Sequence, residues 1–236
     1  MSILLGVHPG GRNKFAVCAL FYSGRFPAMV VRVRSHSGVE AVLQDIIGVV
    51  GEWGELDATA VNSPLTWSGA PNGWRDCDSR LRQMLPAWAP RAWVRPPNSL
   101  AGAVAVQGPA LAWALAQEVK RGLLPKHKMV ETHSRVSLAN VARHMSTSVI
   151  ALARPGLKAS TRRRHIARLV EDLVDAGLIK LEVEPPDTVE ELAALVCAIT
   201  ALGAASAESG LVVAQLPGGD IRPIGKRPVV VLQALP

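Results

Sequence analysis

Residues 3–61 read ILLGVHPGGRNKFAVCALFYSGRFPAMVVRVRSHSGVEAVLQDIIGVVGEWGELDATAV, and their pattern determines which fold we expect. Three apolar runs, Ile3–Val7, Phe15–Tyr22 and Ala28–Val33, are separated by short turns that contain glycine or proline. Apolar runs of this length between turn residues are typical of β-strands. The runs therefore predict an antiparallel meander of three strands at the start of the chain.

A helix and a fourth strand follow this meander. Apolar residues recur at helical spacing over Gly38–Trp53, which predicts an amphipathic helix. Ala58–Val61 reads as a strand, and we expect it to lie parallel to the first strand because a helix crosses over to reach it.

The remainder of the chain alternates helices and strands. The expected helices are Ala110–Gly122, Ser134–His144, Thr161–Gly177 and an alanine-rich one that includes Leu192–Ala207. Further strands are expected at Lys128–Thr132 and, as a hairpin, at Gly210–Gln215 and Ile221–Ile224. Asp187–Glu190 has the form of a capping box, in which Glu190 takes the N3 position of the alanine-rich helix.

This order of elements is that of ribonuclease-H-like folds. We expect an α/β fold with a mixed five-stranded sheet and helices on both faces, formed by residues 1–236 as a single domain. The stretch Pro64–Pro97 is rich in proline, tryptophan and arginine, and it predicts an irregular inserted lid over residues 64–108.

Composition limits the class of protein. Of the 236 residues, 49% are hydrophobic and 19% are charged, which suits a large buried core and not a disordered chain. The formal net charge of +7 favours nucleic acid, DNA or RNA, as the partner over an acidic membrane surface.

Cysteine usage and hydropathy bear on location. Cys18, Cys77 and Cys197 lie far apart without a Cys-x-x-Cys pair, which argues against a zinc site or a disulfide framework and indicates a reducing compartment. The first residues lack the basic region of a signal peptide, and the apolar run Leu192–Ala207 is too short to cross a bilayer. We therefore expect a cytoplasmic protein without a membrane partner.

Six segments give the chain a resemblance to a known family. They are Gly6–His8, Ala60–Leu65, Trp74–Arg82, Val130–Ser134, Lys158–Arg164 and Leu192–Ala198, and the Arg-x-Cys-Asp-x-x-Leu-Arg pattern of Arg75–Arg82 is the most specific. On these segments the chain resembles, nearly end to end, the predicted-nuclease family of ribonuclease-H-like fold filed as domain of unknown function 429.

The resemblance implies a metal-binding acidic cluster that this chain has mostly lost. Family aspartates stand where this chain has His8, Asn62 and Ala193, and a family glutamate matches Glu131. Such a cluster would hold two divalent ions, one activating water and the other stabilising the leaving oxygen. With one carboxylate left, we expect no metal and no cofactor, and a catalytically inactive pseudo-nuclease that binds or scaffolds nucleic acid.

Two other functions remain open. An active nuclease with relocated acids would use Glu131 with Asp78, Glu190 or Glu191, and would then need Mg²⁺ or Mn²⁺. A protein-interaction subunit would instead join a protein complex by docking an acidic partner on its basic lid.

Two groups of basic residues are the expected contacts with nucleic acid. Arg75, Arg80 and Arg82 lie near Trp67 and Trp74, which suits phosphate pairing combined with base stacking. The alternative is an internal bond between Arg75 and Asp78 that orders the lid. The second group lies at the start of a helix and comprises Lys158, Arg162, Arg163, Arg164 and Arg168. Cations there oppose the helix dipole, which favours a bound external anion that compensates them. The alternative is a solvated basic face.

Two further features have alternative interpretations. The glycine turn at His8–Lys14 is either a phosphate cradle or a plain hairpin turn. His133 is either a general base or ligand, or a strand-end histidine with a satisfied hydrogen bond.

Overall fold

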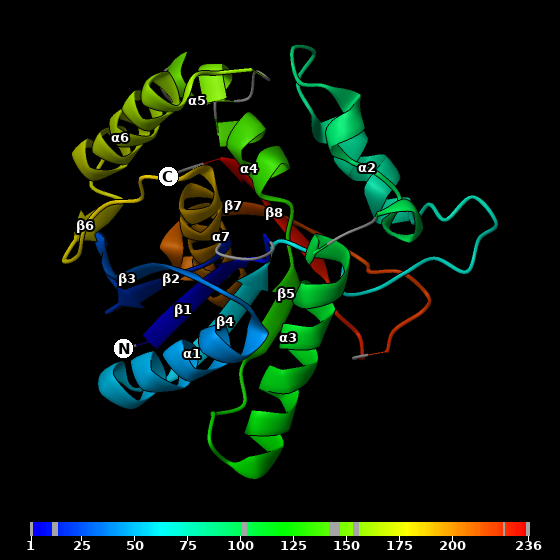
Figure 1. Ribbon diagram of the computed structural model, residues 1–236, viewed down its shortest axis with the longest axis horizontal. Coiled ribbons are helices and arrows are strands. Elements are labelled where there is room, and N and C mark those ends of the chain that lie inside the picture. The colour runs from blue at the N-terminus through cyan, green and yellow to red at the C-terminus, as the bar shows by residue number, and fades with distance from the viewer. Residues whose placement is uncertain are drawn as a thin grey trace.

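A mixed sheet is the central feature of the protein (Figure 1). The computed structural model describes residues 2–10, 14–100, 103–141, 147–152, 156–223 and 225–234. Within these residues there are eight strands: β1 (Ser2–His8), β2 (Phe15–Tyr22), β3 (Ala28–His36), β4 (Leu56–Val61), β5 (Lys128–Glu131), β6 (Ile179–Leu181), β7 (Val212–Leu216) and β8 (Val229–Ala234). The seven α-helices of the same residues are α1 (Val39–Trp53), α2 (Asp76–Met84), α3 (Ala103–Arg121), α4 (Ser134–Val141), α5 (Thr147–Leu152), α6 (Ala159–Asp175) and α7 (Val189–Ala205).

The strand order across the sheet is β6-β3-β2-β1-β4-β5-β8-β7. β1, β2 and β3 pair antiparallel in sequence order, which confirms the predicted meander. β4 lies parallel to β1, as predicted from the helical crossover, and β5 lies parallel to β4. The carboxyl ends of β1, β4 and β5 therefore meet at one edge of the sheet, where open α/β sheets commonly place their ligand sites.

The predicted number of five strands is wrong, because three further strands extend the sheet at its two sides. β6 pairs parallel with β3 over three residues, too few for a clear pattern in the sequence. The second strand of the C-terminal hairpin is Val229–Ala234 and not Ile221–Ile224. Its Val229–Leu232 run is buried, as expected of a strand covered on both faces, whereas Ile221 forms only an isolated bridge to Trp67.

The predicted lid over residues 64–108 is not irregular throughout. It contains the whole of α2 and the start of α3. Cys77, Leu81 and Leu85 are buried against β8 and α4, so tertiary packing stabilises a helix whose composition is otherwise polar. Sequence periodicity did not reveal it for that reason.

The cap of α7 also differs from the prediction by one residue. Thr188 is the N-cap, and its side chain accepts a hydrogen bond from the backbone N–H of Glu191 at 3.1 Å. Glu191, and not Glu190, therefore occupies the N3 position. Glu191 also accepts hydrogen bonds from Ser35 and from the backbone of Asp187.

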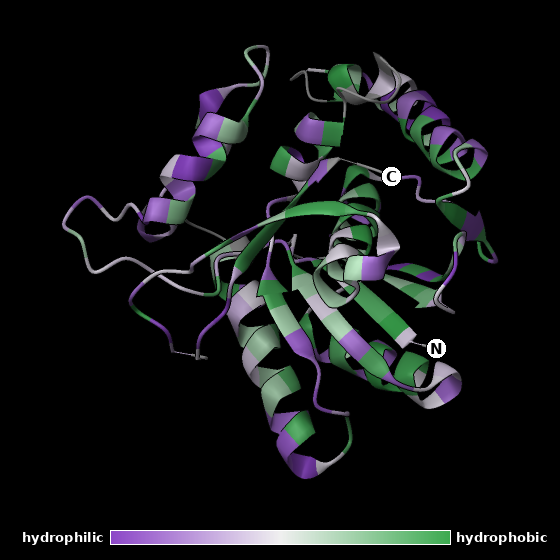
Figure 2. Ribbon diagram, turned by 180° about the vertical axis from the view of Figure 1, so that it is seen from behind, coloured by the Kyte–Doolittle hydropathy of each residue, from purple (hydrophilic) through white to green (hydrophobic). Residues whose placement is uncertain are grey.

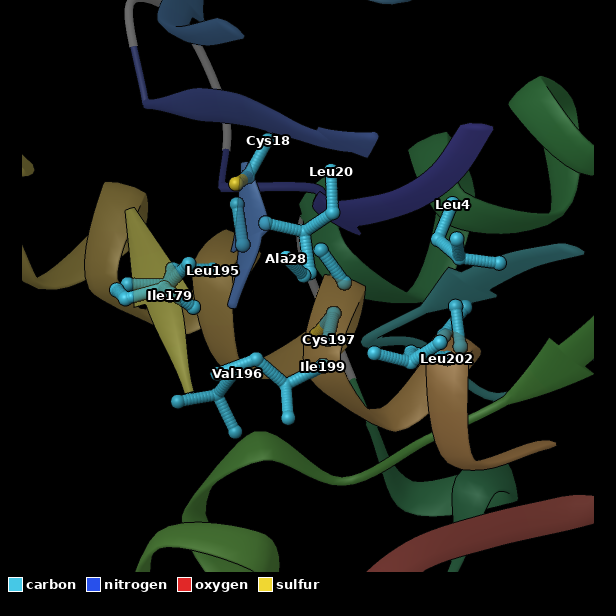
Figure 3. Close-up of a cluster of buried hydrophobic side chains, with 14 of the residues drawn as sticks. Leu4, Cys18, Leu20, Ala28, Ile179, Leu195, Val196, Cys197, Ile199 and Leu202 are labelled. Atoms are coloured by element: carbon cyan, nitrogen blue, oxygen red, sulfur yellow. The ribbon is translucent and has the colours of Figure 1, made fainter. Parts of the chain in front are cut away.

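Helices cover both faces of the sheet, as predicted. On one face α1 and α3 pack against the side chains of Ile3, Leu5 and Val7. On the other, α7 packs against Leu4 and Cys18 among others, and Figure 3 shows this cluster. Figure 2 shows hydrophobic colour along the central strands and hydrophilic colour along α6.

Gly6 allows α7 to lie directly on β1. A Cβ atom at Gly6 would stand 2.0 Å from the carbonyl oxygen of Ala194 and 2.1 Å from the nitrogen of Ala198. The backbone of α7 thus occupies the space that a side chain would fill. Among the described residues, none of the helices combines the length and the apolar character needed to cross a membrane.

Candidate functional site

A cavity of about 260 Å³ opens at the sheet edge where β1, β4 and β5 end. Its lining comes from the last residues of β1 and β5 and the residues that follow β4 and β5, together with α2, the start of α4 and the segment before α3. The lining residues are His8, Asn62, Ser63, Pro64, Arg75, Asp78, Leu81, Trp93, Val94, Arg95, Leu100, Glu131, Thr132, His133 and Arg135.

Three of the four positions at which the family resemblance implies metal ligands line this cavity. They are His8, Asn62 and Glu131. They come together because each stands at the end of one of three neighbouring parallel strands. Ala193 is buried in the first half of α7 and is not among the lining residues.

The side chain of Arg75 fills the acidic end of the cavity. Its Nη1 and Nη2 donate to the two carboxylate oxygens of Glu131, at 2.8 and 2.6 Å. Its Nε and Nη2 also donate to Asp78, at 3.0 and 2.6 Å. The side chain of Arg75 is only 4% exposed, so both ion pairs are buried.

The surrounding backbone completes this triad of Arg75, Asp78 and Glu131. Nη1 of Arg75 donates to the carbonyl oxygen and the hydroxyl of Thr66, so each nitrogen of the guanidinium has an acceptor. The backbone N–H of Leu65 donates to Glu131 at 2.8 Å. Gly219 passes so close that a Cβ atom there would lie 2.8 Å from Cδ of Arg75.

The triad keeps Arg75 charged. Burial opposes the charge, but the carboxylates of Glu131 and Asp78 hold the pKa of Arg75 above its ordinary value. A buried charge of this kind is tolerated only when its partners are in place, and loss of one partner is strongly destabilising. The lid is thus fastened to the end of β5 by an ion pair that water does not screen.

This donor set does not suit a pair of divalent ions. Mg²⁺ requires oxygen ligands at about 2.1 Å, and both oxygens of Glu131 already accept hydrogen bonds from Arg75. Within the described residues, no three histidine, cysteine or acidic side chains gather as a metal-binding group. The guanidinium stands as a permanent cation between the carboxylates.

His8 and Asn62 are hydrogen-bonded to each other. Asn62 accepts from the backbone N–H of Ser134 through Oδ1, so its Nδ2 donates to Nδ1 of His8 at 2.6 Å. This network leaves the proton of the neutral His8 ring on Nε2. Burial lowers the pKa of His8 to about 4, against an opposite influence of Glu190 and with a further lowering by Arg135.

Both ring nitrogens of His133 have hydrogen-bond partners, as the interpretation of a satisfied strand-end histidine requires. One ring nitrogen, Nε2, donates to the carbonyl oxygen of Trp93 at 3.0 Å, which ties the lid to the start of α4. The other, Nδ1, accepts from the backbone N–H of Val136 at 3.4 Å. Burial lowers the pKa of His133 to about 4, although the Trp93 carbonyl acts in the opposite direction.

Three features of the cavity were not anticipated from the sequence. Thr132 is 3% exposed, and its hydroxyl lacks a hydrogen-bond partner among the described residues. Arg95 and Arg135 line the same cavity with exposed side chains. The guanidinium of Arg135 lies 6.0 Å from the centre of the Trp93 ring.

The three arginines of the lid that were expected to contact nucleic acid have different environments. Arg75 is enclosed by protein acceptors and is not available to a phosphate in this conformation, so the alternative of an internal bond to Asp78 holds. Arg82 lies over the ring of Trp74 at 5.0 Å from its centre. Arg80 is exposed on α2.

The second basic group lies at the start of α6, away from the cavity lining. Lys158 is the N-cap, and no acidic residue stands in the first turn. Arg162 is bonded to the Leu157 carbonyl, and Arg163 lies 3.8 Å from the exposed Asp187. Arg168 pairs with two acids of its own helix, whereas Arg164 is exposed.

The glycine turn after β1 falls partly outside the described residues, since Gly11, Arg12 and Asn13 are not among them. Its interpretation as a phosphate cradle therefore stays a prediction. In comparisons with known proteins, no protein-family model, no curated protein and no solved structure matches the chain.

Proposed function

We propose that the protein binds nucleic acid through a ribonuclease-H-like domain that has no nuclease activity. The central strand order β3-β2-β1-β4-β5, antiparallel over β1–β3 and parallel over β4 and β5, supports this assignment of fold. The meeting of His8, Asn62 and Glu131 in one cavity supports a former metal centre at this edge.

The observation that carries the proposal is the bidentate pairing of Arg75 with Glu131. Glu131 is the one carboxylate left at the four former ligand positions, and its two oxygens accept from one guanidinium. A divalent ion would have to displace that guanidinium and leave it buried without its partner. The balance of charge therefore favours the internal cation over a metal.

Nucleic acid is the partner that the charge of the chain favours. The net charge is +7, and exposed basic residues gather at the start of α6, where the helix dipole also attracts anions. Each phosphate bound there should contribute to a salt-dependent affinity.

Cleavage assays test the catalytic half of the proposal. We expect no cleavage of DNA or RNA in the presence of Mg²⁺ or Mn²⁺ above that of the Glu131→Gln variant. Glu118→Gln is the matched control, because Glu118 is a buried carboxylate that pairs with Arg121 outside the cavity. Cleavage that is lost in Glu131→Gln and kept in Glu118→Gln would overturn the proposal.

Salt dependence tests the binding half. Replacing Arg162, Arg163 and Arg164 together by alanine should lower the affinity for duplex DNA. The slope of log affinity against log salt should become shallower by about 0.9 for each phosphate that these arginines neutralise in the wild type. The control removes three positive charges from exposed residues elsewhere, namely Arg25, Lys120 and Lys126. An equal weakening of binding in both triple variants would show a general charge effect and contradict a site on α6.

An active nuclease with relocated acids is the second candidate. It is favoured by the position of Asp78, because Nη2 of Arg75 lies 2.6 Å from both Asp78 and Glu131. Glu190 and Glu191 do not line the cavity. Metal-dependent cleavage that disappears in both Asp78→Asn and Glu131→Gln is the result this candidate requires.

A further inference from the structure

We propose that the cavity binds a phosphomonoester, either the terminal phosphate of a nucleic-acid strand or the phosphate of a free mononucleotide. The inference deepens the proposed function and rests on it for the choice of a nucleotide as the group that carries the phosphate. It assigns a ligand to the place where the metal ions of a nuclease would lie.

One residue of the cavity lining, Thr132, carries a buried polar group without a partner in the described part of the chain. Thr132 is 3% exposed, and its Oγ1 has neither a donor nor an acceptor within the described residues. A buried hydroxyl without a partner lowers stability, and such groups are rare in folded proteins. The oxygen itself is enclosed by protein atoms, so a ligand reaches it only after a rotation of the Thr132 side chain, and the hydroxyl can then donate to a phosphate oxygen.

Hydrogen-bond donors and cations line the same cavity as Thr132. The His8 ring lines the cavity with its proton on Nε2, because Nδ1 accepts from Asn62. Arg95 and Arg135 also line it, and neither forms an ion pair with any described residue. Arg135 lowers the pKa of both His8 and His133, which places its positive field within the cavity.

The two carboxylates of the cavity do not prevent anion binding. Asp78 and Glu131 are both bound to Arg75, so the triad carries a net charge of −1. Arg95 and Arg135 outweigh it, and the lining as a whole has three cations and two anions. Glu190 influences His8 from the start of α7 but is not a lining residue.

Another part of the cavity lining suits the nucleoside part of the ligand. Leu81, Trp93, Val94 and Leu100 give it apolar and aromatic surface, on which a base or sugar can pack. The volume of about 260 Å³ is slightly below that of drug-sized ligand sites, so it fits one nucleotide-sized group and not a duplex. A terminal phosphate also carries more negative charge than an internal diester, which favours a chain end in a site with net positive charge.

The test compares strands that differ only in their end group. Binding is measured for one oligonucleotide sequence with a 5′-phosphate, a 3′-phosphate or hydroxyls at both ends, and separately for a mononucleoside monophosphate and for inorganic phosphate. We expect one phosphorylated end, or the mononucleotide, to bind at least about tenfold more tightly than its hydroxyl counterpart, as charge-assisted hydrogen bonds allow.

Three variants locate the effect. Arg135→Gln removes a cation of the cavity and should abolish the preference for phosphate. Thr132→Val removes the unpaired hydroxyl with little change of shape, so it should reduce the preference while the unfolding midpoint stays unchanged or rises. Arg25→Gln is the matched control, because Arg25 is exposed in the turn between β2 and β3 at the opposite end of β1, and the preference should survive.

The outcomes separate this inference from the proposed function. One outcome is that oligonucleotides bind with a salt dependence set by the α6 arginines and with equal affinity for every end group. That result overturns the inference and leaves nucleic-acid binding intact. Mononucleotide binding that is lost in Arg135→Gln, without affinity for strands, supports the phosphate site and overturns the nucleic-acid function. Loss of the preference in Arg25→Gln as well as in Arg135→Gln would also overturn the site.

Discussion

Arg75 connects the lid to the end of β5, which lies 56 residues further along the chain. Its guanidinium donates to Thr66, to Asp78 on α2 and to Glu131 at the end of β5. Since the triad is buried, these bonds act in a medium of low polarity where a missing partner is costly. Arg75 therefore has two roles, because it neutralises Glu131 and fixes the lid to the end of β5.

Removing this guanidinium should destabilise the protein and create a metal-sensitive site. Arg75→Met keeps a long apolar side chain but leaves Asp78 and Glu131 facing each other, so we expect a decrease of about 3–5 kcal/mol in the free energy of unfolding. Mn²⁺ or Mg²⁺ should restore part of it, because an ion that binds only the folded state stabilises it. Urea unfolding with and without metal measures both effects.

Arg82→Met is the control for this experiment. Arg82 belongs to the same lid but lies half-buried over Trp74, and its removal should cost no more than about 1 kcal/mol. Stability of this variant should not respond to metal. A metal response of equal size in Arg75→Met, Arg82→Met and the wild type would show that Arg75 does not stand in for an ion.

The two histidines of the cavity should make stability depend on pH. Both have a pKa of about 4 in the folded state, below the ordinary value of 6.5. Between pH 6.5 and 4 the unfolded chain binds more protons, so the stability that neutral His8 and His133 provide above pH 6.5 is lost as the pH falls. Each shift corresponds to roughly 3 kcal/mol.

Unfolding free energies measured from pH 7 to pH 4 check this expectation. The double variant His8→Gln, His133→Gln has no imidazole at these positions and should show a much smaller slope. His127, whose pKa is also lowered by burial, should account for part of the slope that remains. An unchanged slope in the double variant would mean that neither ring titrates abnormally.

At the scale of elements, the packing of α7 on β1 depends on the missing side chain of Gly6. Gly6→Ala would force the helix backbone away, because two of its atoms lie within 2.1 Å of the new Cβ. We expect a decrease of about 1–3 kcal/mol or more in unfolding free energy, as for other overpacked cores. Gly48→Ala is the matched control, since Gly48 lies inside α1 with open space around it.

The control should change stability in the opposite direction. Alanine has a higher helix propensity than glycine, so Gly48→Ala should stabilise the protein by roughly 0.5–1 kcal/mol. Thermal or urea unfolding of the two variants measures the contrast. Two variants of similar stability would contradict the close approach of α7 to β1.

Elements with strong local patterns could be predicted from the sequence, and those held by distant parts of the chain could not. The apolar runs of β1, β2 and β3 and the helical spacing of α1 are local signals, and each element lies where they predicted it. In contrast, β6 has three residues, and α2 owes its burial to β8 and α4. Turn residues placed a hairpin strand at Ile221, but burial on both faces selected Val229–Leu232 instead.

The same distinction applies to the site. His8, Asn62 and Glu131 could be brought together from the sequence, because residues at the ends of neighbouring parallel strands meet at one edge. The spacing of Arg75 and Asp78 also raised an internal bond as an alternative. The pairing of Arg75 with Glu131 spans 56 residues and depends on the path of the lid, while Gly219 closes over Thr66 from 153 residues away. No local sequence pattern predicts contacts between segments so far apart in the chain.

At the scale of the whole molecule, the three buried cysteines lie in different parts of the core, and their reactivity can report on each part. Burial raises the pKa of the Cys77 thiol to about 12 and raises those of Cys18 and Cys197 as well, so none should react with a thiol reagent in the folded state. Cys18 and Cys197 lie in the core between the sheet and α7 (Figure 3), whereas Cys77 lies on the buried face of α2. The rates at which the thiols are modified, followed by mass spectrometry, should thus measure separately how fast the core beneath α7 and the packing of α2 open.

We expect Cys77 to be modified first, because α2 can detach while the sheet stays intact. Arg75→Met should speed the modification of Cys77 far more than that of Cys18 or Cys197, and Gly6→Ala should do the reverse. Modification of all three thiols at one common rate in every variant would instead mean that the lid and the sheet open as a single cooperative unit. The rate of modification of Cys77, compared with those of Cys18 and Cys197, therefore measures how often the lid opens while the sheet stays folded.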